Sequence, residues 1–168
     1  PLPRGFACNP EGKKIMTTKR NALITACLLT GAISAGSVWA HGNVTPTAVE
    51  TKGLTPIKDA GVPLDGDGWA ATNPYRTTPE HDKAVEVGAS AYNQNCAACH
   101  GLEAKSGGIA PDLRMLDAGD AGDEWFVERV RHGAVRDGRV YMPKMADYLS
   151  QEALWAVRTY LDSVHVEE

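Results

Sequence analysis

The 168-residue chain carries 17 Lys and Arg residues against 21 Asp and Glu residues, a formal net charge of −4. Residues 1–40 hold five of the basic residues and one of the acidic ones, so the remaining 128 residues carry a net charge of −8. This acidic balance makes nucleic-acid binding a poor prediction, and the length suits one small domain.

Residues 1–40 are predicted to be absent from the mature protein. We interpret residues 1–15 as a leader upstream of the true start, because Met16 is a plausible initiator. Residues 16–40 have the pattern of a secretory signal peptide, with cleavage expected after Ala40 and export to the periplasm. We expect no membrane anchor. The pattern comprises a basic segment, an uncharged apolar run that is short for a membrane span, and small residues before the cleavage site: Lys19 with Arg20, residues 22–35, and Val38 with Ala40.

Residues 41–78 are predicted to form an irregular N-terminal arm. The segment contains four prolines and five glycines and has little hydrophobic periodicity. The simplest alternative is a disordered linker. Trp69 and Tyr75, near its end, instead indicate that the arm docks on the domain that follows.

Residues 79–168 predict an all-α domain of three main helices joined by loops, with no persuasive strand pattern. The first helix is expected to have Thr78 as its N-cap and Pro79 in its first turn, and to end near Asn93. Gly88 lies inside this helix, where glycine costs about 1 kcal/mol relative to alanine. Close contact of the backbone with another helix would explain this glycine.

The motif C-x-x-C-H follows the first helix. Cys96 and Cys99 can add across the two vinyl groups of a haem, and His100 can then bind the iron from one side. One alternative is a thioredoxin-like redox pair, which would need a βαβ pattern around it; another is half of a zinc site, which would need a second pair of soft ligands. The other cysteines, Cys8 and Cys27, lie in the segment predicted to be removed. The motif therefore predicts one covalently attached haem c.

A glycine-containing loop, residues 107–113, is expected to support the histidine. An iron-bound histidine usually donates its other ring N–H to a carbonyl or carboxylate, and we expect the Pro111 carbonyl to accept it from His100. Leu113 is expected to pack against the haem. An ordinary Gly/Pro turn is the alternative.

A second helix is predicted from near Asp123 to Gly133, and a third from Ser150 to Val164. Basic residues gather from the end of the second helix to the segment around Met142, since residues 129–144 have a net charge of +4. We expect a positively charged region beside the methionine side of the haem. Its cations would either face an acidic patch of a partner, or be solvated or neutralise the haem propionates.

Met142 is the predicted second iron ligand. It precedes Pro143, which favours an extended backbone and stiffens the loop that carries the sulfur. A thioether is a soft ligand suited to haem iron. Met145 is the alternative methionine and is interpreted as a residue that packs on the haem, while His132 and His165 are the alternative histidine ligands.

Residues 78–164 resemble class I cytochromes c in the order of their motifs. The resemblance implies an all-α fold around one covalent haem, with a histidine and a methionine as iron ligands. It also implies that the first and last helices cross at Gly88 and Tyr160. Met145 departs from the family, in which this position often holds an aromatic residue. The matching motifs are Gly88 with Tyr92, C-A-A-C-H-G at 96–101, A-P-D-L at 110–113, Y-M-P at 141–143 and L-W-A-V-R-T-Y-L at 154–161.

Most of the chain after Ala40 also resembles the periplasmic cytochromes c paired with PQQ-dependent alcohol dehydrogenases, through residues 41–46, 73–76 and 141–145. This resemblance implies a single-electron carrier and not an enzyme. Its donor would be a PQQ-dependent alcohol dehydrogenase, and its acceptor a terminal oxidase or another cytochrome of the respiratory chain. We expect a monomer. The alternatives are a haem c sensor that binds a ligand, which would need an open iron site, or the haem subunit of another periplasmic oxidoreductase.

Overall fold

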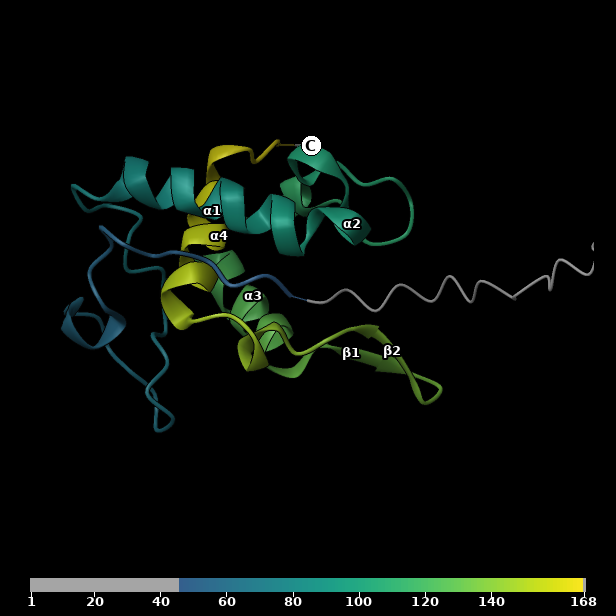
Figure 1. Cartoon of the computed structure of the whole chain (residues 1–168), viewed down its shortest axis with the longest axis horizontal. Coiled ribbons are helices and arrows are strands. Elements are labelled where there is room, and N and C mark those ends of the chain that lie inside the picture. The colour runs from purple at the N-terminus through teal and green to yellow at the C-terminus, as the bar shows by residue number, and fades with distance from the viewer. Residues whose placement is uncertain (1–45, 168) are drawn as a thin grey trace, which may run out of the picture. The chain divides into compact units, whose positions relative to one another are not determined.

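The computed structural model describes residues 46–167, so the predicted leader, the predicted signal peptide and the start of the arm lie outside the described residues. The described chain contains four α-helices, a two-stranded sheet and four short 3-10 helices (Figure 1). None of these helices is long and apolar enough to cross a membrane. In chain order the elements are η1 (Ile57–Asp59), α1 (His81–Asn95), α2 (Ala97–His100), η2 (Leu102–Ala104), η3 (Leu113–Met115), α3 (Asp120–His132), β1 (Ala134–Arg136), β2 (Arg139–Met142), η4 (Met145–Asp147) and α4 (Gln151–Ser163).

The three predicted long helices are present as α1, α3 and α4. The last one begins as predicted, because the Ser150 side chain accepts a hydrogen bond from the Ala153 backbone N–H (3.2 Å). The middle helix begins at Asp120, about one turn before the predicted start at Asp123. The two glycines that flank it, Gly119 and Gly133, both have positive φ and mark its ends.

The predicted N-cap of α1 is wrong. The Thr78 hydroxyl donates to the Tyr75 carbonyl (3.4 Å), and the helix begins later, at His81. Glu80, which occupies the cap position, makes no side-chain cap either. Its carboxylate accepts hydrogen bonds from the Thr55 backbone N–H (2.8 Å) and hydroxyl (2.6 Å). The start of α1 is therefore held by the arm and not by a local cap.

The expectation of no strands is also wrong, because β1 and β2 form a small antiparallel hairpin in which Val135 pairs with Val140. Asp137 and Gly138 make the connection, with φ values of 50° and 74°. Positive φ at both positions is typical of a two-residue Asp–Gly hairpin turn, which is the sequence signal that could have identified it. The strands are only three and four residues long, so the fold stays mainly helical, as expected for a class I cytochrome c.

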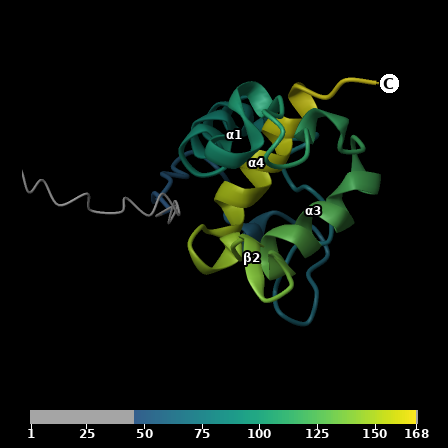
Figure 2. The same cartoon turned by 90° about the vertical axis from the view of Figure 1, so that its right-hand side faces the viewer.

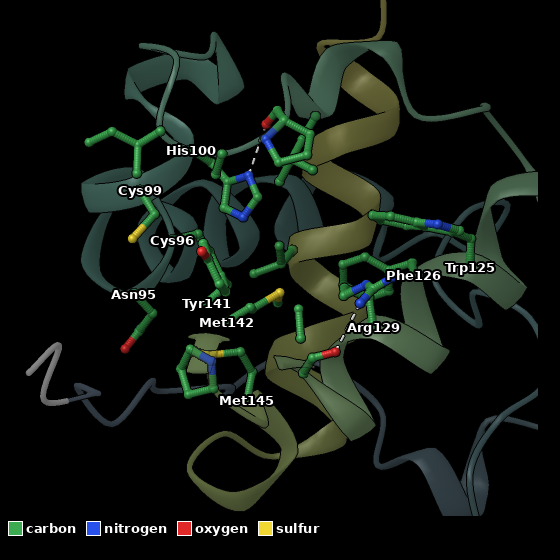
Figure 3. A pocket seen from close by; sticks show the side chains of 18 of the residues that line it. Asn95, Cys96, Cys99, His100, Trp125, Phe126, Arg129, Tyr141, Met142 and Met145 are labelled. Carbon is green, nitrogen blue, oxygen red and sulfur yellow. Dashed lines mark hydrogen bonds between the residues drawn. The ribbon is translucent and has the colours of Figure 1, made fainter. Parts of the chain in front are cut away.

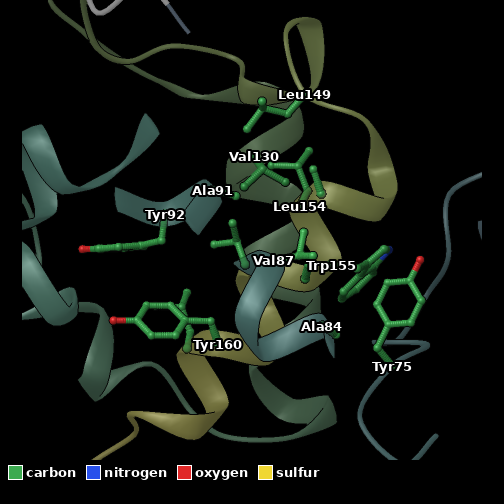
Figure 4. Packing of buried hydrophobic residues seen from close by; sticks show 14 of the residues in the cluster. Tyr75, Ala84, Val87, Ala91, Tyr92, Val130, Leu149, Leu154, Trp155 and Tyr160 are labelled. Carbon is green, nitrogen blue, oxygen red and sulfur yellow. The ribbon is translucent and has the colours of Figure 1, made fainter. Parts of the chain in front are cut away.

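Helices α1 and α4 cross at Gly88, as predicted, and are adjacent in both views (Figures 1 and 2). A Cβ atom at this position would overlap the Ala156 carbonyl and lie 3.0 Å from the Tyr160 Cβ. The Tyr92 and Tyr160 rings pack beside the crossing with their centroids 5.4 Å apart (Figure 4). The crossing contributes much of the apolar core, including the buried Trp155 (1% exposed).

Residues 46–78 of the arm pack on the helices. The Tyr75 side chain is 1% exposed, and its hydroxyl donates to the Thr55 carbonyl (2.7 Å). Trp69 is half-buried, and the guanidinium carbon of Arg131 lies 5.1 Å from the centre of its ring. The predicted docking is confirmed, and the disordered-linker alternative is wrong for this part of the arm.

A group of four charges, of which Asp123 and Arg158 are buried, joins the arm to α3 and α4. The Asp123 side chain is fully buried and accepts from Arg76 Nη2 (2.6 Å) and Arg158 Nε (2.8 Å). Its second oxygen accepts from the Asn73 backbone N–H (2.8 Å). Asp162 pairs with the same two arginines at 3.1 and 2.9 Å. Each buried charge is therefore paired, as buried ions require.

Candidate haem site

A cavity of about 830 Å³ lies between the α1–α2 segment on one side and α3 with the hairpin on the other (Figure 3). Its volume is typical of pockets that hold cofactor-sized ligands. The lining is mostly apolar, and among the described residues it includes no Asp or Glu. All six predicted site residues line it: Cys96, Cys99, His100, Pro111, Leu113 and Met142.

The C-x-x-C-H motif lies at the end of α1 and in the single turn of α2. The backbone N–H groups of Cys99 and His100 both donate to the Cys96 carbonyl (3.1 and 3.0 Å). This tight turn places both thiols and the imidazole on the wall of one cavity. Gly101 ends the turn with a φ of 82°, and its carbonyl accepts a hydrogen bond from the Tyr92 hydroxyl (2.7 Å). The motif is therefore anchored to α1 at both ends.

Cys96 does not have the character of a redox-active cysteine. Burial raises the pKa of the Cys96 thiol to about 12, and the neighbouring Cys99 acts in the same direction. Redox-active cysteines need a lowered pKa, because the thiolate is the reactive form. For the zinc alternative, no group of three or more His, Cys, Asp or Glu side chains within residues 46–167 is arranged to hold a metal ion.

His100 makes the hydrogen bond that the sequence predicts. Its Nδ1 lies 2.9 Å from the Pro111 carbonyl oxygen, which leaves Nε2 free for a metal (Figure 3). The loop that carries Pro111 is itself braced. Ser106 Oγ donates to the Ala110 carbonyl (2.5 Å), and the Ser106 N–H donates to the Asp112 carboxylate (3.2 Å). The loop is therefore more than an ordinary Gly/Pro turn.

Met142 is the last residue of β2 and is half-buried at the cavity. Figure 3 shows its sulfur and the His100 ring pointing into the cavity from different sides. The backbone at Met142 packs directly against Gly133, which has a φ of 68°. A Cβ atom at Gly133 would overlap the Met142 carbonyl, so only glycine allows this close contact. Met145 is buried in η4 (4% exposed) and lines the same cavity.

The two alternative histidine ligands do not reach the cavity. The His132 side chain is 58% exposed, with its Nε2 3.5 Å from Glu128. His165 lies beyond the end of α4 and is not part of the cavity lining. Among the described histidines, only His100 lines the cavity.

The wall contributed by α3 was not predicted. Trp125 and Arg129 lie one helical turn apart, and the guanidinium carbon is 5.3 Å from the indole ring centre. Arg129 also donates to the Gly133 carbonyl (3.0 Å), which ties the end of α3 to the hairpin that carries Met142. An aromatic residue and an arginine at i and i+4 are the sequence signal that could have identified this pair.

The residues present fit a c-type haem. Two adjacent thiols, a braced imidazole and a thioether from another wall are the donors that such a group requires. The apolar lining would exclude water from a flat aromatic ring.

Comparison with known proteins places the chain in a family. The profile of the family described as cytochrome C oxidase, cbb3-type, subunit III matches residues 83–161. Cytochrome c550 of Pseudomonas aeruginosa is 62% identical over 151 residues, which cover 89% of this chain and 99% of that protein. The chain therefore belongs to the cytochrome c family. It carries one covalently bound haem c and is a monohaem electron carrier.

More distant matches involve enzymes. Quinohemoprotein alcohol dehydrogenase ADH IIB of Pseudomonas putida is 35% identical over 95 residues, which cover 56% of this chain but 13% of that enzyme. The dehydrogenase subunit of the quinone alcohol dehydrogenase of Gluconobacter oxydans is 32% identical over 110 residues, covering 64% of this chain and 13% of that subunit. No solved structure matches the chain.

Proposed function

We propose that Cys96 and Cys99 form the thioether links to the haem, and that His100 and Met142 are its axial ligands. The observation that best supports this assignment is the meeting of the imidazole and the thioether in one apolar cavity (Figure 3). The Pro111 carbonyl orients the imidazole through its hydrogen bond, and Leu113, which lines the cavity, would pack on the haem.

This ligand set favours electron transfer over ligand sensing. The bound haem supplies a one-electron Fe(III)/Fe(II) couple. A thioether favours ferrous iron and so raises the reduction potential, while histidine and methionine together leave the iron no open position. The reduced protein should therefore fail to bind carbon monoxide at neutral pH, whereas a sensor would bind it.

The proposed donor is a PQQ-dependent alcohol dehydrogenase in the periplasm, and the proposed acceptor is a terminal oxidase or another cytochrome. Two observations support the donor. Parts of the chain are similar to segments of quinohemoprotein alcohol dehydrogenases. Residues 16–40 also have the pattern of an export signal.

Anaerobic stopped-flow spectroscopy tests this proposal. The ferric holoprotein is mixed with a purified PQQ-dependent alcohol dehydrogenase and its alcohol, and haem reduction is followed by absorbance. We expect second-order reduction that depends on both alcohol and PQQ. The matched control is the same dehydrogenase without PQQ. Equal rates with and without PQQ would refute the proposed donor.

A further inference from the structure

The structure divides the basic segment 129–144 into groups that face different surroundings. Arg131 turns to the arm, where its guanidinium binds Asp65 (2.7 Å) and Asp67 (2.6 Å). Arg129 is half-buried, and its guanidinium donates a hydrogen bond to the Gly133 carbonyl (3.0 Å). Both side chains are therefore engaged by other parts of the chain. The cations that remain lie on the hairpin and directly after it.

These remaining cations have no acidic partner in the described chain. Within residues 46–167, no ion pair involves Arg136, Arg139 or Lys144. Arg136 and Arg139 are also direct partners across the two strands, an arrangement of like charges that costs stability. All three are exposed, and the hairpin that carries Arg136 and Arg139 lies at one end of the described structure (Figure 1). Such a local loss of stability is expected where cations are used to bind a partner.

The same hairpin exposes apolar side chains. Val135 and Val140, which pair across the strands, are 62% and 67% exposed, and Tyr141 is 61% exposed. Val135, Tyr141 and the neighbouring Arg136 also line the haem cavity, so a partner that touches them lies at the cavity mouth. Neighbouring strand residues project to opposite sides, so the paired valines and the paired arginines lie on the two sides of the hairpin. We name the hairpin surface the exposed residues of both sides and of the segment that follows: Val135, Arg136, Arg139, Val140, Tyr141 and Lys144.

The outer face of α3 has the opposite charge. A second groove between α3 and the arm is lined by the acids Asp120, Glu124 and Glu128. The chain after residue 40 has a net charge of −8, so most of its surface repels an acidic partner. The hairpin surface combines positive charge, exposed apolar area and nearness to the haem cavity.

We propose that the hairpin surface is the docking site for an acidic patch that also exposes apolar side chains, on the electron-donating dehydrogenase. This inference rests on the proposed function. Electron-transfer complexes are small and short-lived, so the cations act mainly by accelerating encounter, and the valines and tyrosine provide the contact. Steering of this kind raises association rates by about 10- to 1,000-fold and depends on salt.

Charge reversals away from the cavity lining test the proposal. The double variant Arg139→Glu/Lys144→Glu changes the hairpin surface, and Lys52→Glu/Lys58→Glu changes two exposed lysines of the arm by the same total charge. The rate of haem reduction by the reduced dehydrogenase is measured from low to high ionic strength. At low salt we expect the hairpin variant to be about tenfold slower and the arm variant to be within about twofold of wild type. The rates should converge at about 1 M salt, where the screening length is about 3 Å.

Two controls separate docking from other effects. Reduction by ascorbate and the reduction potential should match wild type in both variants, which shows that the haem environment is intact. Cosedimentation with phosphatidylserine-containing vesicles should be absent for wild type. Vesicle binding that only the hairpin variant loses, with an unchanged reduction rate, would assign the surface to a membrane and overturn the proposal.

The remaining outcomes are equally decisive. Equal slowing of both variants would mean that net charge acts without a specific site. An unchanged hairpin variant, with wild type still reduced by the dehydrogenase, would overturn the docking site alone. If the dehydrogenase fails to reduce wild type at all, the proposed donor falls, and the docking site with it.

Discussion

Replacing Asp123 by alanine should strongly destabilise the folded holoprotein. The side chain is fully buried and accepts hydrogen bonds from Arg76, Arg158 and the Asn73 backbone. Removing it leaves the Arg158 guanidinium, 1% exposed, with Asp162 as its one carboxylate partner among the described residues. Breaking a buried ion pair from one side costs about 3–5 kcal/mol, a large part of the roughly 5–15 kcal/mol that stabilises a typical domain.

Asp120→Ala is the matched control. Asp120 lies on the same helix and binds the same Arg76 at 2.6 Å, but its side chain is 76% exposed. An exposed pair contributes about 0–1 kcal/mol, and the charge at the helix start adds about 0.3–1 kcal/mol, so the loss should stay below about 2 kcal/mol. Urea unfolding of the ferric holoprotein, followed by far-ultraviolet circular dichroism, gives both values. Equal losses in the two variants would refute the reasoning from burial.

Two further predictions concern the helix crossing and the arm. Gly88→Ala should cost about 1–3 kcal/mol, because its Cβ atom overlaps the Ala156 carbonyl, whereas Gly107→Ala, with open space around it, should change the urea midpoint little. Thr55→Val should weaken the acid dependence of stability. Hydrogen bonds from Thr55 lower the pKa of the Glu80 carboxyl in the folded protein. These bonds therefore stabilise the fold fully above the unfolded pKa of Glu80, about 4.3. Their contribution is lost as the pH falls through the lower pKa of the folded state. Between about pH 6 and pH 3, the free energy of unfolding measured with urea should fall less in the variant than in wild type. An identical fall in both proteins would contradict this linkage.

The parts of the site that sequence analysis predicted are encoded locally. The two cysteines and His100 are brought together by one helical turn, so their spacing alone determines the geometry. The Pro111 hydrogen bond could be expected because the imidazole of a metal-bound histidine needs an acceptor for its second nitrogen. Met142 could be placed because it precedes a proline between two helices, although the segment that carries it is strand β2 and not the expected irregular loop.

The parts that were missed depend on contacts between distant segments. Arg131 was grouped with the hairpin cations, but it binds Asp65 and Asp67, more than 60 residues earlier in the chain. Arg129 and Arg131 are two residues apart on a helix and therefore point to different faces, which helical geometry alone would have indicated. The start of α1 was misplaced because Glu80 is held by Thr55 of the arm, and no local pattern contains that contact.

The assignment of Met142 as an iron ligand is the central claim, and the reduction potential of two methionine variants tests it most directly. Met142→Ala should lower the potential by on the order of 100 mV or more and let the reduced protein bind carbon monoxide, because the thioether favours ferrous iron and closes the site. Met145→Ala should keep the potential close to wild type and remain closed to carbon monoxide. The reverse result, with Met145→Ala opening the iron and Met142→Ala leaving it closed, would contradict the assignment.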